Sequence, residues 1–296
     1  MAERTEALRC EQDDEDGAVL VVTVDHPPSN LLDGAVVRAL HELLENLDGL
    51  DGFAGDTPPK VLVFRSADPD FFVMHADVEG LLAAPPRRPR EPVEGPNLAA
   101  ALLHRLHTAS VVTIGVIDGA ARGGGCELLS ALDFRIGSER TVIGQPEVPL
   151  GILPGAGGSV RWPRLVGRSR ALDLLLTGRD LRADEALAWG WLDRLVPSGR
   201  LLDEALALAR RIAQMPAASI AAVKRAVDAS LGDLGPALAV ESAELAGLMA
   251  AGAHVAPMRR FLAAGGQTRE GEGDVDRMAE VVARTIADQD TPETYS

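Results

Sequence analysis

Two glutamates, each in a glycine-rich turn, are the side chains of this sequence best suited to acid–base chemistry. Glu127 follows three glycines in the run Asp118-Gly-Ala-Ala-Arg-Gly-Gly-Gly-Cys-Glu-Leu-Leu, and Glu147 lies in the run Thr141-Val-Ile-Gly-Gln-Pro-Glu-Val-Pro-Leu-Gly-Ile-Leu-Pro-Gly-Ala-Gly-Gly. Two carboxylates facing one reacting centre can divide general-base and general-acid work when their surroundings set different protonation states. Because the two residues are too far apart in sequence to share a helical face, the spacing equally allows two unrelated surface glutamates.

The triple glycine before Glu127 indicates a turn at which a ligand can approach the backbone. Glycine has no Cβ, so backbone N–H groups there are accessible. A strand, such a turn and a helix start together present N–H donors and a positive dipole end to an anion or a developing oxyanion. The apolar run Val111-Val-Thr-Ile-Gly-Val-Ile predicts the strand, and close packing alone is the alternative use of the turn. After the second glycine cluster, Ser159 is the predicted N-cap of a helix to about Val166.

Three segments, in this order, resemble turns of the enoyl-CoA hydratase/isomerase (crotonase) superfamily. Phe71-Phe-Val-Met-His-Ala-Asp-Val resembles F-x-A-G-A-D-[IL], and the runs around Glu127 and Glu147 resemble N-G-x-x-x-G-G-G-x-E-L and G-Q-P-E-x-x-L-G-x-x-P-G-x-G-G. The resemblance extends from about Val19 to about Leu262. It implies an α/β fold, a crotonase-like spiral of ββα turns followed by a C-terminal helical region.

The resemblance also implies a role for each residue of the matched turns. The N–H groups of Ala76 and Gly124 are expected to form an oxyanion hole for a thioester carbonyl. Glu127 is expected to activate water and Glu147 to protonate the α-carbon, which together imply reversible addition of water to a 2-enoyl-CoA thioester. Coenzyme A then enters only as part of the substrate, and no metal or redox cofactor is implied. The neighbouring residues expected to contact the substrate are His75, Asp77, Gly123 and Pro146.

Some positions depart from the family pattern. His75 replaces the glycine before the oxyanion alanine, and Arg122 precedes the triple glycine where the family has an aliphatic residue. The basic residues that normally hold CoA phosphates are absent, both in the early turn and after Phe261-Leu. The arginines of the Pro-rich segment 83–96 are candidates to replace them, with Lys224 as a second candidate; a solvated loop is the alternative. These arginines are Arg87, Arg88 and Arg90.

Two other functions stay open at this point. His75 and Arg122 favour another crotonase-type acyl-CoA enzyme, such as an isomerase, a decarboxylase or a biosynthetic C–C-forming member. A catalytically idle assembly or binding protein with the same fold is the third hypothesis. The presence of both acids and both oxyanion turns weighs against it.

Composition and charge argue against several other classes of protein. Acidic residues outnumber basic ones by 44 to 29, and a net charge of −15 argues against nucleic-acid binding. No apolar run is long enough for a membrane span, and the acidic N-terminus lacks the apolar core of a secretory signal. Cys10 and Cys126 make no disulfide framework, which fits a cytoplasmic location, and Cys126 is expected to be a packing residue. His104 and His107 share a helical side but lack further metal ligands.

Periodicity predicts the elements that position these residues. Strands are expected over 19–25, 60–65 and 132–137, and helices from Asp33, as N-cap, to about Leu50 and over 97–108. Helices are expected to dominate from Ser169 onward.

The expected organisation is a core over residues 1–210 that carries the site and a helical region over 211–296. Val275, Met278, Val282 and Ile286 form an apolar stripe that predicts an extra helix at 274–287, docked on its own subunit or on another. Members of the family form trimers, often paired into hexamers, so the resemblance implies a homotrimer or hexamer.

Overall fold

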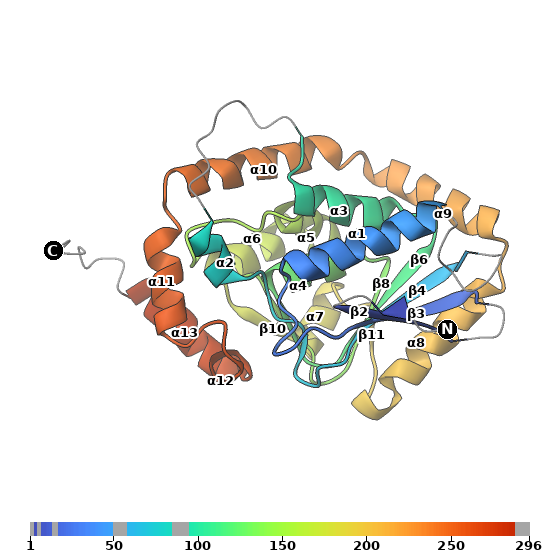
Figure 1. Ribbon diagram of the computed structural model, residues 1–296, viewed down its shortest axis with the longest axis horizontal. Helices are drawn as coiled ribbons and strands as arrows, with labels where there is room; N and C mark the ends of the chain where they lie inside the picture. The colour runs from blue at the N-terminus through green and yellow to red at the C-terminus, as the bar shows by residue number, and fades with distance from the viewer. Residues whose placement is uncertain (1–2, 5–6, 14–16, 50–57, 85–94, 288–296) are drawn as a thin grey trace.

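The computed structural model describes residues 3–4, 7–13, 17–49, 58–84 and 95–287. Its strands form two sheets (Figure 1). The larger sheet has the order β1 (Glu3–Arg4), β2 (Leu8–Gln12), β3 (Val19–Val24), β4 (Val61–Ser66), β6 (Val112–Ile117), β8 (Phe134–Gly137) and β11 (Arg194–Leu195). The smaller sheet has the order β10 (Asp180–Arg182), β9 (Val142–Gly144), β7 (Ala120–Arg122) and β5 (Phe71–Val73). The predicted strands over 19–25, 60–65 and 132–137 are β3, β4 and β8.

Successive turns of the chain repeat one ββα unit. β4, β6 and β8 lie in the larger sheet, and each is followed by a strand of the smaller sheet, β5, β7 or β9. A helix then follows each pair: α2 (Val78–Ala83), α4 (Gly123–Ser130) or, after a longer turn, α5 (Gly158–Val166). The equivalent strands pair in parallel, so the units stack on one another. This arrangement is the predicted spiral.

Helices cover both faces of the larger sheet at its centre, which is why the central strands β3, β4 and β6 are mostly apolar. All residues of β3 and β6 are buried. Because side chains alternate along a strand, Leu20 and Val22 pack toward α1 (Gly34–Gly49), while Val19 and Val21 pack against α8 (Leu201–Ala213).

Two predicted helix starts have different outcomes. Asp33 Oδ1 accepts hydrogen bonds from the N–H groups of Ala35 and Val36 at 2.8 and 3.1 Å, so Asp33 caps α1 as predicted. The prediction that Ser159 caps α5 is wrong. The chain enters α5 through Gly157, whose φ of 104° is left-handed, and Ser159 already lies in the first turn with its hydroxyl directed to Pro154 O.

Helices dominate the rest of the chain, as predicted. They are α3 (Leu98–Thr108), α6 (Arg168–Thr177), α7 (Ala183–Trp189), the short η1 (Ser198–Arg200), α9 (Ala217–Leu231), α10 (Gly235–Ala250), α11 (Val255–Ala263), α12 (Arg269–Glu272) and α13 (Val275–Ala287). Helix α8 runs across the predicted boundary between residues 210 and 211, and the division into two regions stays a prediction. No helix within the described ranges is both long enough and apolar enough to cross a bilayer.

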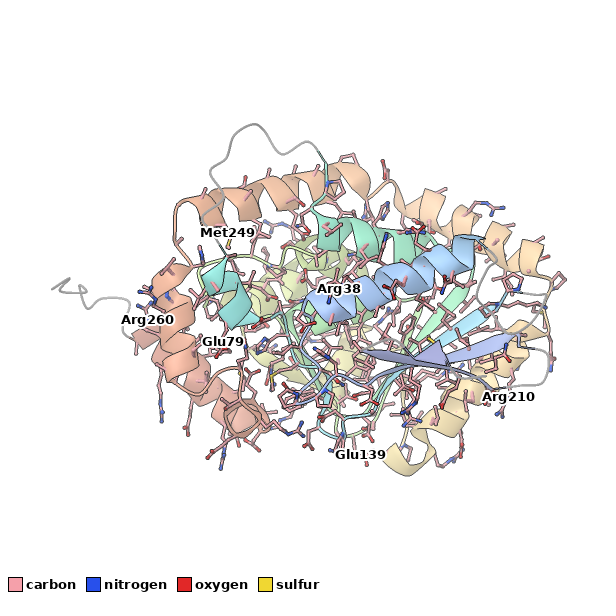
Figure 2. All side chains as sticks on the ribbon, viewed as in Figure 1. Arg38, Glu79, Glu139, Arg210, Met249 and Arg260 are labelled. Carbon is pink, nitrogen blue, oxygen red and sulfur yellow. The ribbon has the colours of Figure 1, made fainter. Side chains whose placement is uncertain are left out.

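The predicted extra helix is α13, and it docks on its own subunit. It lies beside α11 at the end of the molecule that also carries α2; Figure 2 marks Glu79 of α2 and Arg260 of α11 there. Arg260 Nε donates to Thr285 O at 3.0 Å. The predicted stripe is wrong in part: Ile286 is 43% exposed, because α11 meets the face that carries Met278, Val281 and Val282.

Candidate active site

The two predicted oxyanion donors lie next to each other. Ala76 follows β5 and Gly124 lies in the first turn of α4 after β7, and β5 and β7 are parallel neighbours. A Cβ placed on Gly124 would be 3.6 Å from the backbone nitrogen of Ala76. His75 O accepts a hydrogen bond from Leu32 N at 2.8 Å, which holds the peptide between His75 and Ala76 in one orientation.

Gly123 brings one of the predicted acids to the same place. Its φ is +47°, a conformation that suits glycine, and an added Cβ would lie 2.8 Å from Glu147 Oε1 and 3.3 Å from His75 Cβ. Any side chain at position 123 would therefore displace the carboxylate of Glu147. The predicted substrate contacts Gly123 and His75 thus adjoin Glu147, while contact with substrate itself stays a prediction.

The second predicted acid is held by the second glycine cluster. Glu127 lies on α4, and its buried Oε1 accepts hydrogen bonds from Ala156 N at 2.7 Å and from Gly158 N at 2.8 Å. Burial raises the pKa of Glu127 above its ordinary value, and the two N–H donors oppose that rise. The two glycine-rich runs therefore meet at this carboxylate.

Glu147 has a less favourable environment for a negative charge. Burial, followed by repulsion from Glu127, raises the pKa of Glu147 well above its ordinary value. With the Gln145 amide oriented to satisfy its neighbours, its nitrogen donates to both Glu147 oxygens at 3.1 and 3.0 Å, and its oxygen accepts from Trp162 Nε1 at 3.2 Å. Glu127 accepts hydrogen bonds from two backbone N–H groups, whereas the charge of Glu127 acts against ionisation of Glu147. The arrangement therefore favours ionisation of Glu127 over ionisation of Glu147.

Two buried charges beside this pair had no clear sequence signal. Glu241 of α10 accepts a hydrogen bond from Gly157 N at 2.7 Å, and burial, then the charge of Glu127, raises its pKa to about 8. Arg161 of α5 donates to Ala156 O at 3.0 Å, and its charge lowers the pKa of Glu127. Both residues thus contact the turn that holds Glu127. The nearest sequence signal for Glu241 is a glutamate within a mostly apolar helix.

The two residues that depart from the family pattern share a partner that the sequence did not reveal. His75 Nε2 lies 2.7 Å from Glu272 Oε1, and Arg122 Nη1 donates to Glu272 O at 3.0 Å. The guanidinium of Arg122 also binds both carboxylate oxygens of Asp180, at 2.9 and 2.7 Å. Arg122 and Glu272 are 1% and 0% exposed. Glu272 lies beyond the region of family resemblance, so no motif pointed to it.

The other residues singled out in the matched turns lie near the site. Asp77 Oδ1 accepts a hydrogen bond from Gln267 Nε2 at 2.9 Å, and Pro146 is buried in the turn before Glu147. Their contact with substrate stays a prediction. Cys126 is fully buried in the main core, which confirms it as a packing residue, and burial raises the pKa of its thiol well above the ordinary value.

Of the candidates for holding CoA phosphates, Lys224 alone lies within the described residues. Lys224 Nζ donates to Asp133 Oδ2 at 2.6 Å and to Val111 O at 2.7 Å, so its charge is already paired, and its contact with CoA phosphates stays a prediction. Arg87, Arg88 and Arg90 lie outside the described residues. In the part of the chain that is described, no three His, Cys, Asp or Glu side chains group together as metal ligands.

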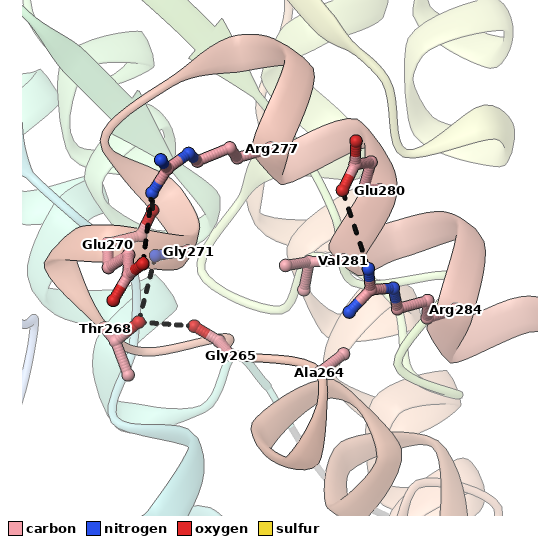
Figure 3. Close-up of a pocket in the computed structure, with 9 residues that line it drawn as sticks. All are labelled: Ala264, Gly265, Thr268, Glu270, Gly271, Arg277, Glu280, Val281 and Arg284. Carbon is pink, nitrogen blue, oxygen red and sulfur yellow. Dashed lines mark hydrogen bonds and ion pairs between the residues drawn. The ribbon is translucent and has the colours of Figure 1, made fainter.

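A surface pocket of about 270 Å³ lies elsewhere, where α12 and α13 face the end of α11 (Figure 3). Its charged side chains pair with one another: Arg277 with Glu270 at 3.4 Å and Arg284 with Glu280 at 3.6 Å. None of the predicted site residues lines it. Its lining residues are Ala264, Gly265, Thr268, Glu270, Gly271, Arg277, Glu280, Val281 and Arg284.

Known proteins resemble this chain over most of its length. A candidate enoyl-CoA hydratase from Streptomyces avermitilis is 32% identical, with a TM-score of 0.79 over 95% of this chain and 100% of that one. An enoyl-CoA hydratase from Bacillus anthracis is 25% identical, with a TM-score of 0.68 over 87% and 95% of the two chains. DspI from Pseudomonas aeruginosa is 29% identical, with a TM-score of 0.69 over 78% and 89%.

The fold and the family match agree. Two mixed sheets wound as a spiral and followed by a C-terminal helical region make up the crotonase fold. Residues 14–253 match the enoyl-CoA hydratase/isomerase family model, and the chain belongs to that family.

Proposed function

We propose that this crotonase-family protein is a lyase that adds water reversibly to a 2-enoyl-CoA thioester. The observation that carries the proposal is the buried pair of Glu127 and Glu147, held beside the backbone N–H groups of Ala76 and Gly124. A single site with two acids in different electrostatic environments and two donors for an oxyanion suits addition across a double bond conjugated to a thioester.

Glu127 is the general base of the proposed reaction. Two backbone N–H groups and the charge of Arg161 favour its ionised form despite burial. It accepts a proton from water as the oxygen bonds to the β-carbon of the substrate. Electrons then move to the thioester oxygen, and the N–H groups of Ala76 and Gly124 stabilise the enolate, each by about 2.7–4 kcal/mol of barrier.

Glu147 is the general acid that completes the addition. Burial and the charge of Glu127 raise its pKa and favour the protonated form, which can donate its proton to the α-carbon. The hydroxyl then stands on the β-carbon, the new hydrogen stands on the α-carbon, and the enolate returns to a thioester. Transfer of the water-derived proton away from Glu127 and reprotonation of Glu147 restore the starting state.

Another acyl-CoA reaction of the same family is the second candidate. The side chains of His75 and Arg122, where relatives have glycine and an aliphatic residue, favour chemistry that differs from hydration. Double-bond isomerisation, decarboxylation and C–C bond formation are the reactions of this class. A catalytically idle assembly protein is the third candidate, and the conjunction of both acids and both N–H donors argues against it.

We also propose a cytoplasmic homotrimer or hexamer. None of the residues of α9, all of which the structure describes, is buried. Val223, Val227 and Leu231 on this helix are 63%, 52% and 58% exposed. An apolar helical face of this kind supports burial against another subunit.

A spectrophotometric screen of 2-enoyl-CoA thioesters with different chain lengths and branches tests the proposed function. Hydration removes the conjugated double bond, so absorbance of the enoyl thioester should fall. In the reverse reaction, started from 3-hydroxyacyl-CoA, the same absorbance should rise. Saturated acyl-CoA provides the blank. If 3-enoyl-CoA is instead converted to the conjugated 2-enoyl form and no hydroxyacyl product appears, the protein is an isomerase.

A further inference from the structure

We propose that Glu272 and His75 are positioning residues through which the C-terminal segment 267–272 holds the oxyanion turn at Ala76 in place. This inference rests on the proposed function, because it takes the Ala76 N–H as an oxyanion donor. The segment lies beyond residue 253, where the family match ends, yet it is hydrogen-bonded to three residues of the turn. These are His75, Asp77 and Val78, and the ring of His75 in turn contacts Ala76 O.

The imidazole of His75 bridges the segment and the turn. Its Nε2 lies 2.7 Å from Glu272 Oε1, and its Nδ1 lies 2.6 Å from Ala76 O. Both partners are acceptors, so the imidazolium form, with two N–H donors, satisfies both bonds. Burial by itself lowers the pKa of His75. The charge and hydrogen bond of Glu272 raise it by more than burial lowers it, so the net pKa is above the ordinary value.

Gln267 makes a second set of bonds to the same turn. Its side-chain oxygen accepts from Val78 N at 2.6 Å, its side-chain nitrogen donates to Asp77 Oδ1 at 2.9 Å, and its backbone N–H donates to Glu272 Oε1 at 2.6 Å. Gln267 adopts a φ of 60°, in the left-handed region that few non-glycine residues occupy. The three hydrogen bonds made by its side-chain oxygen, side-chain nitrogen and backbone N–H stabilise this conformation.

The segment is itself anchored on both sides, so Glu272 is a fixed point. Arg122, which is bound to Asp180, donates to Glu272 O, and the ring of Phe261 packs edge-on against the ring of His75 at 5.9 Å. Arg269 donates to Pro28 O at 2.7 Å and is also paired with Asp68 and Asp70. The charged groups that face His75 are Glu272 and Arg122, and Asp180 and Asp274 act in turn on Arg122.

These contacts fix the donor because the bonds surround one peptide group. Leu32 N holds the carbonyl of His75, the His75 ring holds the carbonyl of Ala76, and the intervening N–H belongs to Ala76. Relatives have glycine at position 75, which cannot form the ring bridge. In catalysis, a displacement of about 1 Å can cost about 10²-fold in rate. A loosened turn should therefore affect turnover more than binding.

The experiment uses a chromophore that reports the oxyanion hole directly. A cinnamoyl-CoA with a para-dimethylamino group absorbs at longer wavelength when hydrogen-bond donors polarise its carbonyl. The full-length protein and the variants Glu272→Ala, Glu272→Gln and Glu270→Gln are compared with bound probe, with binding measured by equilibrium dialysis. Glu270 is the matched control, because it lies on the same helix, is exposed and pairs only with Arg277 among the contacts shown in Figure 3.

We expect the wild type and Glu270→Gln to give the same red shift. Glu272→Ala should lose most of the shift while still binding the probe, and kcat should fall by about 10²-fold with a much smaller change in KM. Glu272→Gln should retain most of the shift, because the amide can still bond to His75 and to Gln267 N. If Glu272→Ala does not fold, Gln267→Ala provides the comparison and should lose part of the shift.

The possible failures are distinguishable. A wild-type shift that persists in folded Glu272→Ala, or in Gln267→Ala where the former does not fold, overturns the positioning role and leaves the proposed function intact. Bound probe without any shift in the wild type overturns the oxyanion hole, and both proposals fail together.

Discussion

His75 Nε2 and Glu272 Oε1 lie 2.7 Å apart in the protein interior, although 197 positions separate the two residues in sequence. A buried ion pair is stabilising only when its geometry and its surrounding hydrogen bonds offset the loss of hydration. Here Gln267 N and the Arg122 guanidinium lie beside the carboxylate, and the second ring nitrogen of His75 has its own acceptor. Removing one member of the pair should therefore cost more than removing both.

The pair predicts a pH window for stability. The pKa of His75 is raised, so its contribution is complete below the ordinary value of 6.5 and is lost as pH rises through the folded value. The pKa of Glu272 is lowered, so its contribution is complete above 4.5 and is lost on acidification. Thermal unfolding of wild type and a His75→Asn/Glu272→Gln variant should differ most between these values. A difference in Tm that is constant from pH 5 to 9 would contradict this linkage.

The two-acid assignment predicts separate losses of activity. Glu127→Gln and Glu147→Gln should each lower kcat by about 10²–10⁴-fold while thioester binding persists, because each removes a general acid or base. Glu244→Gln, an exposed change on α10, is the control and should leave kcat unchanged. Full hydration activity in Glu147→Gln would refute the assignment and favour chemistry that needs one acid, such as isomerisation.

Replacing Glu241 by Gln should stabilise the protein at alkaline pH. In the folded protein the pKa of Glu241 is raised to about 8, whereas in the unfolded chain this group ionises near 4.5. Between these pH values the unfolded state releases the proton more readily, so the wild type loses stability as pH rises. Glu241→Gln does not titrate and can still accept the Gly157 N–H. Its advantage in the free energy of unfolding, followed through Tm, should appear above pH 4.5, grow until about pH 8 and then level off, with an upper size of a few kcal/mol. An advantage that is independent of pH would show that the Glu241 charge is not the cause.

The exposed apolar face of α9 predicts an oligomer. Light scattering at micromolar concentration should give the mass of a trimer or hexamer, and Val223→Asp/Val227→Asp should shift the mass toward the monomer. Leu98→Asp, at another exposed position, is the control. A monomer mass for the wild type would refute the proposed assembly.

The position of α13 predicts what deletion of residues 274–296 does. Met278, Val281 and Val282 cover Met258 and Phe261 of the same subunit, so the deletion should lower Tm by exposing these side chains. The number of subunits, obtained from the mass of the assembly and that of the shortened chain, should stay that of the wild type. A change in the number of subunits without loss of stability would place α13 in a subunit interface.

The three arginines of segment 83–96 predict how an acidic protein binds a polyanionic carrier. With a net charge of −15, positive groups are needed near the CoA phosphates. Replacing Arg87, Arg88 and Arg90 by Ala should raise KM for an acyl-CoA and reduce its salt dependence. The KM for a short N-acetylcysteamine thioester, which lacks those phosphates, should not change. An equal response of both substrates, or of neither, would show that these arginines do not bind the carrier.

Much of the fold and part of the site could be predicted from sequence, where the evidence is local. The apolar runs gave β3 and β4 because a buried parallel strand needs apolar side chains on both faces. Asp33 was found as a cap because its bonds reach only to residues 35 and 36. The glycine-rich turns around Glu127 and Glu147 were visible for the same reason. The prediction that Ser159 caps α5 was wrong because the chain enters the helix through Gly157 in a left-handed conformation, which the sequence pattern of an N-cap does not indicate.

The sequence by itself determined the family and pointed to the two predicted acids and the turns that carry the predicted donors, since each depends on residues close together in the chain. Only the tertiary structure decided the partners of the charged side chains. It paired the half-buried Lys224 with Asp133, put the buried Glu241 beside the turn that holds Glu127, and joined His75 to Glu272. A buried charge requires a partner, but any of 44 acidic residues could satisfy that requirement on composition alone. The packing of the helices on the spiral decides which acidic residue becomes the partner.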